Sequence, residues 1–447
     1  MWVGRLHLLV SCPLPSGPRL RGPFSYKRRQ KPLAFQEGVW YTTNMIDRDL
    51  LRQHPEIVKE SLTKRGEDPK KLDRYLELEK KWRAIASQVE PLQAEKNKLS
   101  RGGKPSPALL KKAQELSKKI AAKEGDLKAA EMAYQTAAKA LPNLVADDVP
   151  VGPGESANTT IGQFGRIRLQ TGKPHHELMT KLGWLDLKTA AEFSGSRFRY
   201  LKGNAAWAHL QIMGEALRLA VHHGFTPVIP PVMTRTETLE KAGFLPFAED
   251  DFFKIEGDDL LLTGTSEQTL LALMAGKTFK ESELPIRLVG FSTCFRREVG
   301  SYGKDVEGMF RQHQFDKVEM VSITTPETAL EEHEFLVSME EMFVKKLGLP
   351  YQKVLIGSGD LGPTAVKKID IEAWFPSQGR YRETHSASNC TDFQARRLGI
   401  KYRTLDGQER LTHTLNGTLA TERLLISYIE NNQRPDGSVN LPRHWRV

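Results

Sequence analysis

The sequence predicts an α/β protein of the α+β type, in which an antiparallel sheet flanked by helices follows an antiparallel coiled-coil hairpin. Two observations support this fold class. Apolar residues over positions 72–141 recur at alternating spacings of three and four around one break, which is the pattern of two paired helices. Beyond the hairpin this pattern stops, and short β-compatible runs alternate with amphipathic helical patterns. We therefore expect a leader over residues 1–44, a helical domain over 45–150 and an α/β domain over 151–447.

Composition limits the classes of protein to which the chain can belong. Its 447 residues, 39% of them hydrophobic, suffice for two or three domains with a sizeable core. No run approaches the roughly 18 to 20 consecutive apolar residues of a membrane span, so we expect no membrane association. The cysteines Cys12, Cys294 and Cys390 lie far apart, which excludes a disulfide framework or zinc-ligand spacing and favours a reducing compartment.

Residues 1–44 differ in composition from the rest of the chain. They contain seven Lys or Arg against one acidic residue, Glu37, with several Pro and Gly and no sustained periodicity. This composition fits an organellar transit peptide, which would place the protein in the mitochondrial matrix. Alternatively, the segment is an upstream extension of a reading frame that normally starts at Met45, and the protein is cytoplasmic. In both cases we expect the segment to be disordered.

The helical hairpin is predicted from its break, its charge and its seam. Residues 100–107, SRGGKPSP, cannot continue a helix, and they separate two arms of roughly 27 to 33 residues, each about 40 to 50 Å long. Residues 70–141 carry 17 Lys and Arg against 9 Asp and Glu, a surplus of 8 that favours a polyanionic partner. The alternatives are a solvated helix face and an oligomerisation coiled coil. The expected seam consists of Tyr75, Leu78, Trp82, Ile85, Val89, Leu92, Lys96 and Leu99 on the first arm and Leu109, Ala113, Leu116, Ile120, Lys123, Leu127, Ala130, Tyr134, Ala137 and Leu141 on the second.

A linker rich in Pro and Gly, residues 141–160, precedes the second domain. Residues 207–222 then have the pattern of a helix, and an apolar strand-like run that follows ends at Pro231, which is typical of a sheet edge. The expected apolar face of that helix consists of Leu210, Met213, Leu217 and Val221.

A Leu-rich strand pattern leads into Thr265, Ser266 and Glu267, after which a helical pattern begins. Taken alone, Ser and Glu at the start of a helix are a cap. The alternative is a pocket for a small amino acid, because a carboxylate can hold its ammonium group and small hydroxylated side chains can hold a polar substituent.

The most informative stretch is residues 291–320, FSTCFRREVGSYGKDVEGMFRQHQFDKVEM. We expect two antiparallel strands joined by a long loop, with Arg296 and Glu298 at the end of the first strand and Arg311, Phe315 and Glu319 on the second. This set of side chains suits a nucleotide, since an Arg can bind a phosphate, an Arg and a Phe can enclose an adenine, and a carboxylate can accept an amino group. The alternative is a surface hairpin with solvated charges.

Two further patterns lie near the C-terminus. Ile369, Ile371 and Ala373 alternate with polar residues as in a strand, and we place Glu383 on the following strand or turn. Residues 412–433, THTLNGTLATERLLISYIENNQ, predict a strand with Asn416 and Thr418 at its end, followed by a helix that carries Arg423.

Taken together, these motifs resemble the class II aminoacyl-tRNA synthetases and, over residues 45–442, the seryl-tRNA synthetase family. Pro231 matches motif 1, residues 295–319 resemble motif 2, residues 412–433 resemble motif 3, and the text from Met45, MIDRDLLRQHPEIVKESLTKRG, is similar to the usual bacterial-type beginning. The resemblance implies activation of L-serine by ATP to seryl-adenylate, and transfer of the seryl group to tRNA(Ser), and to tRNA(Sec) wherever such a tRNA exists. It also implies a homodimer, Mg²⁺ bound with ATP, and a hairpin that reaches the long variable arm and elbow of the tRNA.

The same resemblance implies the roles of individual residues. Arg296 would stabilise the charge that develops on the α-phosphate, and Arg423 would contact the γ-phosphate, so that no side-chain nucleophile is required. The implied catalytic residues are Arg296, Glu298, Glu383 and Arg423. The implied serine-binding residues are Thr265, Ser266, Glu267, Glu319, Asn416 and Thr418. The implied ATP-binding residues are Arg296, Arg297, Glu298, Arg311, Phe315, Glu383, Thr384, His385, Ser386 and Arg423. Glu383 and Ser386 are implied to bind Mg²⁺ through ATP.

The chain departs from the family pattern at three points. His385 stands where the family has a smaller residue, and we expect its ring to point away from the site. Motif 3 has seven positions from Asn416 to Arg423 where the family has eight, and Glu422 stands where Gly or Pro is typical. We expect residues 417–421 to form a loop that absorbs the difference, because a rotation of the following helix would expose its apolar face. We also expect Glu422 to contribute little.

Two alternatives from other functional classes remain. A non-catalytic paralogue of the family would bind RNA or a protein partner, and the shortened motif 3 is the observation that favours it. A stand-alone ligase would load an amino acid onto a carrier protein, but such enzymes lack a basic hairpin. Serine-dependent exchange of pyrophosphate into ATP, measured with and without charging of tRNA, distinguishes the three.

Overall fold

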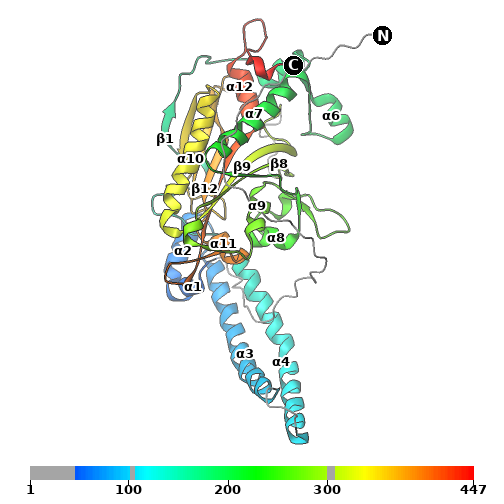
Figure 1. Cartoon of the computed structure of the whole chain (residues 1–447), viewed down its shortest axis with the longest axis vertical. Coiled ribbons are helices and arrows are strands. Elements are labelled where there is room, and N and C mark those ends of the chain that lie inside the picture. The colour runs from blue at the N-terminus through cyan, green and yellow to red at the C-terminus, as the bar shows by residue number, and fades with distance from the viewer. Residues whose placement is uncertain (1–45, 101–105, 300–307) are drawn as a thin grey trace, which may run out of the picture. The chain divides into compact units, whose positions relative to one another are not determined.

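The computed structural model describes residues 46–100, 106–299 and 308–447 (Figure 1). The predicted leader, residues 1–44, therefore lies outside the described residues. So do residues 300–307, at the centre of the loop that was predicted to join the two strands of residues 291–320. Among the helices of the described part, none is long and apolar enough to cross a membrane.

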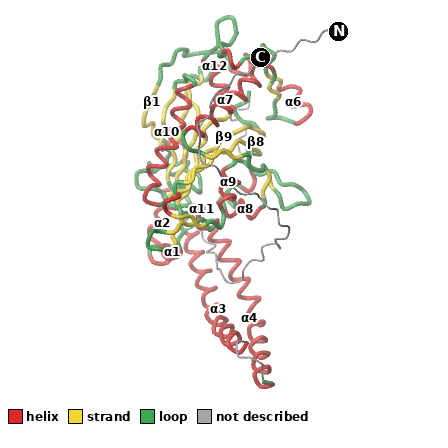
Figure 2. Tube along the Cα trace, in the orientation of Figure 1, coloured by secondary structure: helices red, strands yellow, loops and turns green. Residues whose placement is uncertain are grey.

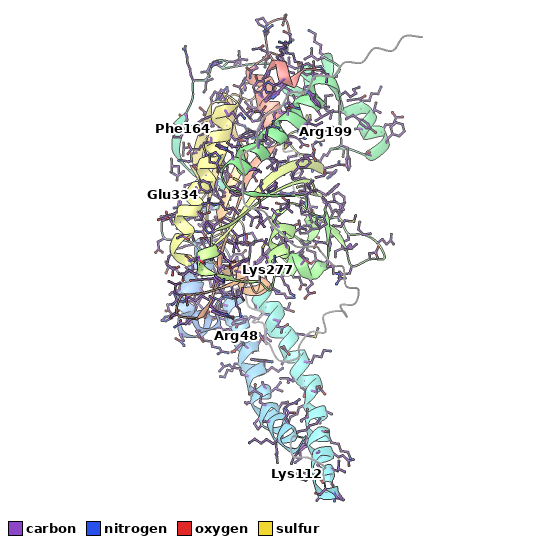
Figure 3. All side chains as sticks on the ribbon, viewed as in Figure 1. Arg48, Lys112, Phe164, Arg199, Lys277 and Glu334 are labelled. Carbon is purple, nitrogen blue, oxygen red and sulfur yellow. The ribbon has the colours of Figure 1, made fainter. Side chains whose placement is uncertain are left out.

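The helical hairpin predicted over residues 72–141 is confirmed. Two short helices, α1 (Arg48–Gln53) and α2 (Pro55–Lys64), precede the long helices α3 (Lys70–Ser100) and α4 (Pro107–Lys139), which pack side by side (Figures 1 and 2). We call α3 and α4 the arm. Ser106 caps α4 and Pro107 occupies its first turn, which fixes where the second helix begins. Towards the tip, Lys112 pairs with Glu95 across the two helices at 2.8 Å (Figure 3). The seam residues that are buried are Tyr75, Val89, Leu116, Ile120, Ala130, Tyr134 and Leu141, whereas Leu109 is exposed.

Arg65, which follows α2, joins the base of the arm to the second domain. Its guanidinium group donates to five backbone carbonyl oxygens at 2.5 to 3.2 Å, and burial lowers its pKa to about 10. An Arg is suited to this task because its planar group has five N–H donors in a fixed arrangement. The acceptors belong to Asn143, Leu144, Leu361, Gly362 and Ala365.

The predicted antiparallel sheet is also confirmed. Within the described residues the main sheet has eight strands in the order β1-β10-β11-β12-β15-β9-β8-β4, and only the β4–β8 pair at one edge is parallel. In that order the strands are β1 (Thr159–Phe164), β10 (Tyr351–Leu355), β11 (Lys367–Phe375), β12 (Arg380–Asn389), β15 (His413–Thr421), β9 (Gln314–Thr324), β8 (Ile286–Phe295) and β4 (Thr226–Val228). Smaller sheets are formed by β14 (Glu409–Leu411), β13 (Lys401–Arg403) and β7 (Thr278–Lys280), by β2 (Leu185–Asp186) and β3 (Tyr200–Leu201), and by β5 (Met233–Thr234) and β6 (Leu261–Leu262).

A layer of helices packs against the main sheet (Figure 1). The layer consists of α7 (Gly203–His222), α10 (Ala329–Lys346) and α12 (Glu422–Asn431), and with the sheet it encloses the largest apolar cluster. The remaining helices are α5 (His175–Lys181), α6 (Leu187–Ser194), α8 (Thr236–Lys241), α9 (Glu267–Met274) and α11 (Phe393–Leu398).

The predicted apolar face of the helix over 207–222 is wrong in part. Met213 is buried, but Leu210 and Val221 are 53% and 47% exposed. Small residues make the close contact with the sheet instead, because Ala at spacings of four lets the helix axis approach the strands. Leu210 and Val221 are left on the outer surface of α7. The buried positions are Ala205, Ala208, His209, Ile212, Met213, Glu215, Ala216 and Ala220.

Candidate active site

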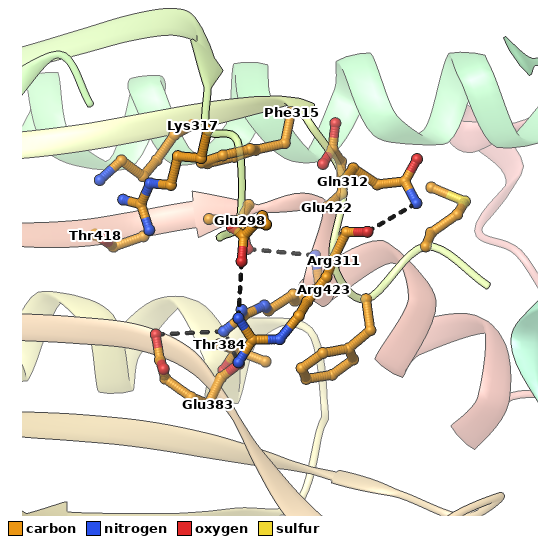
Figure 4. Close-up of a pocket in the computed structure, with 14 residues that line it drawn as sticks. Glu298, Arg311, Gln312, Phe315, Lys317, Glu383, Thr384, Thr418, Glu422 and Arg423 are labelled. Carbon is orange, nitrogen blue, oxygen red and sulfur yellow. Dashed lines mark hydrogen bonds and ion pairs between the residues drawn. The ribbon is translucent and has the colours of Figure 1, made fainter. Parts of the chain in front are cut away.

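A pocket lies where the β8–β9 hairpin meets β12 and the start of α12 (Figure 4). The sequence pointed to eight of the residues that line it, from four separate segments of the chain: Arg296, Glu298, Arg311, Phe315, Glu383, Thr384, Thr418 and Arg423. The pocket is also lined by Met309, Phe310, Gln312, Lys317, Thr421 and Glu422.

The strand pairing around the loop fixes the position of Arg296. β8 and β9 are antiparallel, with Phe295 opposite Gln314, and the Arg296 N–H donates to the carbonyl of His313 at 3.0 Å. The Arg296 Nε donates to the Gly264 carbonyl at 3.2 Å, and its guanidinium carbon lies 5.3 Å from the centre of the Phe315 ring. Backbone and side-chain contacts therefore hold this cation at the pocket wall.

Glu298 is held in an uncommon backbone conformation. Its φ is +53°, in the left-handed region that non-Gly residues rarely adopt. The Asp251 carboxylate accepts from the Glu298 N–H at 2.7 Å, and Arg197 donates to the Glu298 carbonyl at 3.1 Å. The Glu298 side chain pairs with Arg311 at 2.8 Å (Figure 4). These bonds on both sides of the residue stabilise a conformation that otherwise costs about 1 to 3 kcal/mol.

Arg423 projects into the pocket from the first turn of α12. Its Nη1 donates to the Glu383 carbonyl at 2.9 Å and lies 3.3 Å from the Glu383 carboxylate, and its guanidinium carbon lies 4.6 Å from the centre of the Phe310 ring. Partial burial of Glu383 in the cleft acts to raise its pKa, but Arg423 and Lys368 outweigh this effect and the pKa is lowered. Glu383 is therefore ionised at neutral pH.

The expected loop over residues 417–421 is absent. β15 continues to Thr421 and α12 begins at the next residue, and the register against β9 shifts between Thr418 and Ala420. The irregularity lies inside the strand, where a bulge can redirect side chains without a loop. The helix keeps its expected faces, since Leu424, Leu425 and Ile429 are buried and Arg423 faces the pocket.

The expectation that Glu422 contributes little is at odds with its surroundings. Its side chain is 4% exposed, forms an ion pair with Arg199 and accepts from the backbone N–H of Asp316 at 3.0 Å. A buried carboxylate paired with a nearly buried guanidinium cannot be removed at low cost, because the partner charge would be left unpaired.

Two buried carboxylates, Glu267 and Glu319, lie in a cluster of polar side chains beside this pocket. Glu267 accepts from Asn416 at 3.1 Å, and Glu319 accepts from Thr418 at 3.0 Å and pairs with Lys317 at 2.6 Å. Gln394 also donates to Glu267, at 2.8 Å, and Thr265 accepts from the N–H of that residue at 3.2 Å. Burial, and next the nearby Glu319 carboxylate, raise the pKa of Glu267 to about 7.

Three residues that the resemblance implied lie elsewhere. Arg297 borders a different cavity, together with residues 194–198 and His313. His385 is fully buried and bonded to Thr384, and burial lowers its pKa to about 3, so its ring points away from the site as expected. Ser266 packs against Gly290 on β8, where a Cβ added at the glycine would lie 2.9 Å from the Ser266 hydroxyl oxygen. The structure therefore does not bring these three side chains into the pocket.

Carboxylates on the neighbouring strands could hold a divalent cation. Asp370, Glu372 and Glu383 border one cavity that adjoins the first, and Ser386 bonds to Asp370. Asp370 Oδ1 is buried without a hydrogen-bond partner, and burial raises the pKa of Asp370 to about 7. Oxygen donors of this kind fit Mg²⁺.

Sequence reasoning missed Lys317 and Phe310. Side chains on one face of a strand recur every second residue, so Phe315 and Glu319 on β9 already implied that Lys317 faces the same pocket. Phe310 lies under the guanidinium groups of both Arg382 and Arg423, at 3.8 and 4.6 Å.

Comparison with known families covers most of the chain. Residues 45–145 match the seryl-tRNA synthetase N-terminal domain, and residues 252–432 match the tRNA synthetase class II core domain (G, H, P, S and T). The chain is 44% identical over 404 residues to the serine–tRNA ligase of Mycobacterium tuberculosis (strain ATCC 25618 / H37Rv), which covers 89% of this chain and 96% of that protein. The serine–tRNA ligase of Mycobacterium ulcerans (strain Agy99) is 43% identical with the same coverage.

Solved structures show a similar fold. The crystal structure of seryl-tRNA synthetase from Pyrococcus horikoshii complexed with ATP has a TM-score of 0.81 and 37% identity, covering 90% of this chain and 97% of that chain. The cytoplasmic serine-tRNA ligase from Naegleria fowleri in complex with AMP has a TM-score of 0.77 and 34% identity, covering 89% and 96%.

Proposed function

The chain belongs to the seryl-tRNA synthetase family of class II aminoacyl-tRNA synthetases, and on this basis we propose that it activates L-serine with ATP and transfers the seryl group to tRNA(Ser). The observation that carries this proposal is the shared lining of one pocket by Arg296, Arg311 and Arg423, with the buried carboxylate of Glu319 bonded to Thr418 in the pocket wall. Such a site can bind a polyphosphate and an ammonium group at once.

The reaction has two steps. The serine carboxylate attacks the α-phosphate of ATP and pyrophosphate leaves, and the terminal ribose hydroxyl of the tRNA then takes the seryl group. Arg296 stabilises the charge that develops on the α-phosphate, and Arg423 binds the γ-phosphate. Arg311 and Phe315 hold the adenine, and Glu298 accepts from its amino group. Glu267 and Glu319 bind the serine ammonium, while Thr265 and Thr418 form the small polar pocket around its side chain.

Mg²⁺ is part of the proposal. Glu383, with Ser386 and the neighbouring Asp370, would hold it together with ATP, and when bound it supplies positive charge to the phosphates. The orphaned buried oxygen of Asp370 supports a cation at this position. Glu383 also pairs with Arg423, so the same carboxylate orients the arginine that binds the γ-phosphate.

Serine affinity should rise with pH. The pKa of Glu267 is raised to about 7, so this carboxyl is largely neutral at pH 6 and largely ionised at pH 8. Because the ionised form binds an ammonium, the KM for serine should fall by about tenfold between pH 6 and pH 8. The KM for serine is measured at each pH by pyrophosphate exchange at a fixed, saturating concentration of ATP. Glu267→Gln should abolish this dependence, and a parent KM that is flat over the same range would contradict the role of Glu267.

Arg423→Ala should raise the KM for ATP and slow activation by about 10- to 100-fold, the loss of a charge-assisted contact worth about 1.5 to 3 kcal/mol. Arg434, an exposed Arg beyond the end of α12, provides the control, because Arg434→Ala removes the same charge outside the pocket. Unchanged ATP kinetics in Arg423→Ala would favour the non-catalytic paralogue instead.

Further parts of the proposal concern partners. The basic arm contacts the variable arm and elbow of tRNA(Ser), and of tRNA(Sec) where it exists. The exposed apolar residues Trp207, Leu210, Val221 and Ile229 on and after α7 support a homodimer that covers them. We place the enzyme in the cytoplasm, and in the mitochondrial matrix if residues 1–44 are a transit peptide.

One experiment tests the activation step. We expect purified protein to exchange labelled pyrophosphate into ATP only when serine is added. Exchange without subsequent charging of tRNA would favour a ligase that loads a carrier protein, and no exchange with any amino acid would favour the non-catalytic paralogue.

A further inference from the structure

We propose that Glu422 is a positioning residue for ATP: together with Arg199, it fixes the backbone beside Arg423 and Phe315, the two side chains assigned to phosphate and adenine. The inference rests on the proposed function, because it concerns the same pocket. It also concerns a feature of this chain, since the resemblance led us to expect Gly or Pro at position 422.

Glu422 is the first residue of α12 and joins three segments of the chain. Its Oε1 forms an ion pair with Arg199, which immediately precedes β3 and is labelled in Figure 3. The same oxygen accepts from the Asp316 N–H on β9 at 3.0 Å. Arg199 in turn donates to the Gln314 carbonyl at 2.5 Å. One carboxylate and one guanidinium group therefore tie the start of α12 to the start of β9.

These bonds act on both neighbours of Phe315. Gln314 is held by Arg199 through its carbonyl, and Asp316 is held by Glu422 through its N–H. The Asp316 side chain is fixed as well, because it lies 2.9 Å from His209 Nε2 on α7 and accepts from Thr293 on β8 at 2.7 Å. Phe315 thus has little freedom to turn, and its ring stays beside Arg296 at the pocket wall.

Arg423 is fixed from its other side. The backbone N–H of Arg423 donates to the Thr421 hydroxyl at 3.3 Å. The preceding residue, Glu422, is bonded through its carboxylate to the Asp316 N–H on β9. The guanidinium group can then extend over Phe310 towards Glu383. Because a catalytic cation must be held within a fraction of an ångström of its working position, loss of the Glu422 anchor should weaken ATP binding.

Arg199 supplies the charge opposite to that of Glu422, which favours a structural link over a metal site. The ligand atoms of His209, Asp316 and Glu422 lie within 4.8 Å of one another, as a cation site would require. However, the side chain of Arg199 is only 10% exposed and already supplies the positive charge that the Glu422 carboxylate needs. Replacing Glu422 with a neutral residue would leave that guanidinium group buried without its direct partner, with only the charge of nearby Asp316 to balance it.

The chain contains a matched control. Glu332 is also a buried carboxylate in the first turn of a helix, α10, and it is paired with an arginine, Arg287. It also bonds to β9, where Ser322 donates to it at 2.7 Å. It lies towards the opposite end of β9 from Phe315 and outside the lining of the pocket. Glu332→Gln therefore repeats the chemical change without touching the ATP site.

The test compares Glu422→Gln with Glu332→Gln by the ATP dissociation constant from calorimetry, the KM values in serine-dependent exchange, and the Tm. We expect both variants to lower the Tm, but only Glu422→Gln to raise the dissociation constant and KM for ATP, by about tenfold, with the KM for serine within twofold of the parent value. Equal effects of both variants on ATP, or an ATP dissociation constant within twofold of the parent in Glu422→Gln, would overturn the positioning role.

A double variant, Glu422→Gln with Arg199→Met, separates positioning from stability and provides the test if Glu422→Gln alone fails to fold. The double change removes the buried ion pair as a whole, and Asp316 keeps its contacts with His209 and Thr293, so we expect the Tm to recover while the KM for ATP stays at least fivefold above the parent value. Recovery of ATP affinity together with the Tm would overturn the proposal. An inactive parent protein would overturn the proposed function and this role with it, whereas an active parent with unaltered ATP affinity in the variants overturns this role alone.

Discussion

Replacing Arg296 with Ala should lower the rate of seryl-adenylate formation by about 10² to 10³, because it removes a positioned contact to the reacting phosphate worth roughly 3 to 4 kcal/mol of transition-state stabilisation. The side chain is held at the pocket wall by the Gly264 carbonyl and the Phe315 ring, so little of its binding energy is spent on ordering it. The measurement is serine-dependent exchange of pyrophosphate into ATP, and tRNA affinity should be largely retained.

The neighbouring residue Arg297 provides a control that distinguishes a role of Arg296 in the chemistry from a general effect of removing a charge. The resemblance alone implied that Arg297 also binds ATP, whereas the structure places it at a separate cavity. Arg297→Ala should therefore slow exchange far less than Arg296→Ala does. Exchange within threefold of the parent in Arg296→Ala would remove this residue from the chemistry.

Shortening the arm should abolish charging of tRNA and spare the activation of serine. The structure indicates where to cut: Tyr75 and Tyr134 lie in the apolar cluster at the base of the arm, which Phe393 of the second domain joins, and should be kept. Lys123 bonds to Gln88 across the two helices, which shows that these two positions lie side by side. Residues 87–122 can therefore be replaced by a short linker that joins α3 to α4 at this level of the arm. This deletion removes 8 Lys and Arg but only 3 acidic residues.

The arm prediction has its own control in the salt dependence of the intact protein. Lys and Arg that bind phosphates release counterions, so tRNA affinity should fall steeply between 50 and 200 mM salt. In the shortened variant both the affinity and its salt slope should decrease, while pyrophosphate exchange remains near the parent rate. If the shortened variant charges tRNA at near-parent efficiency, the hairpin has another role, and the oligomerisation alternative regains support.

Periodicity and local chemistry explain why much of the fold and site could be predicted. The seam of the arm repeats along both helices, and the break at residues 100–107 is strong, so both helices were predicted close to their observed limits. The second strand of the motif was predicted to carry Arg311, Phe315 and Glu319; β9 carries Phe315 and Glu319, but the prediction was wrong for Arg311, which precedes the strand. Motif spacing singled out Arg296 and Arg423, and both line the same pocket, each within two residues of the end of a strand.

The errors have a common cause in tertiary packing. On α7 the large apolar residues were taken as the buried face, but the sheet accepts Ala at that distance and leaves Leu210 exposed. The irregularity in motif 3 was placed in a loop, whereas it lies within β15. The partner of Glu422 is Arg199, more than two hundred positions earlier in the chain, and no sequence pattern connects the two.

The most direct test of the account is aminoacylation of purified tRNA(Ser) by the full-length chain, with labelled serine and ATP. We predict that acid-precipitable serine accumulates on tRNA(Ser), that the reaction depends on ATP, and that a transcript without its long variable arm is charged poorly. Serine-dependent pyrophosphate exchange without charging of any tRNA, or charging with a different amino acid, would contradict the account.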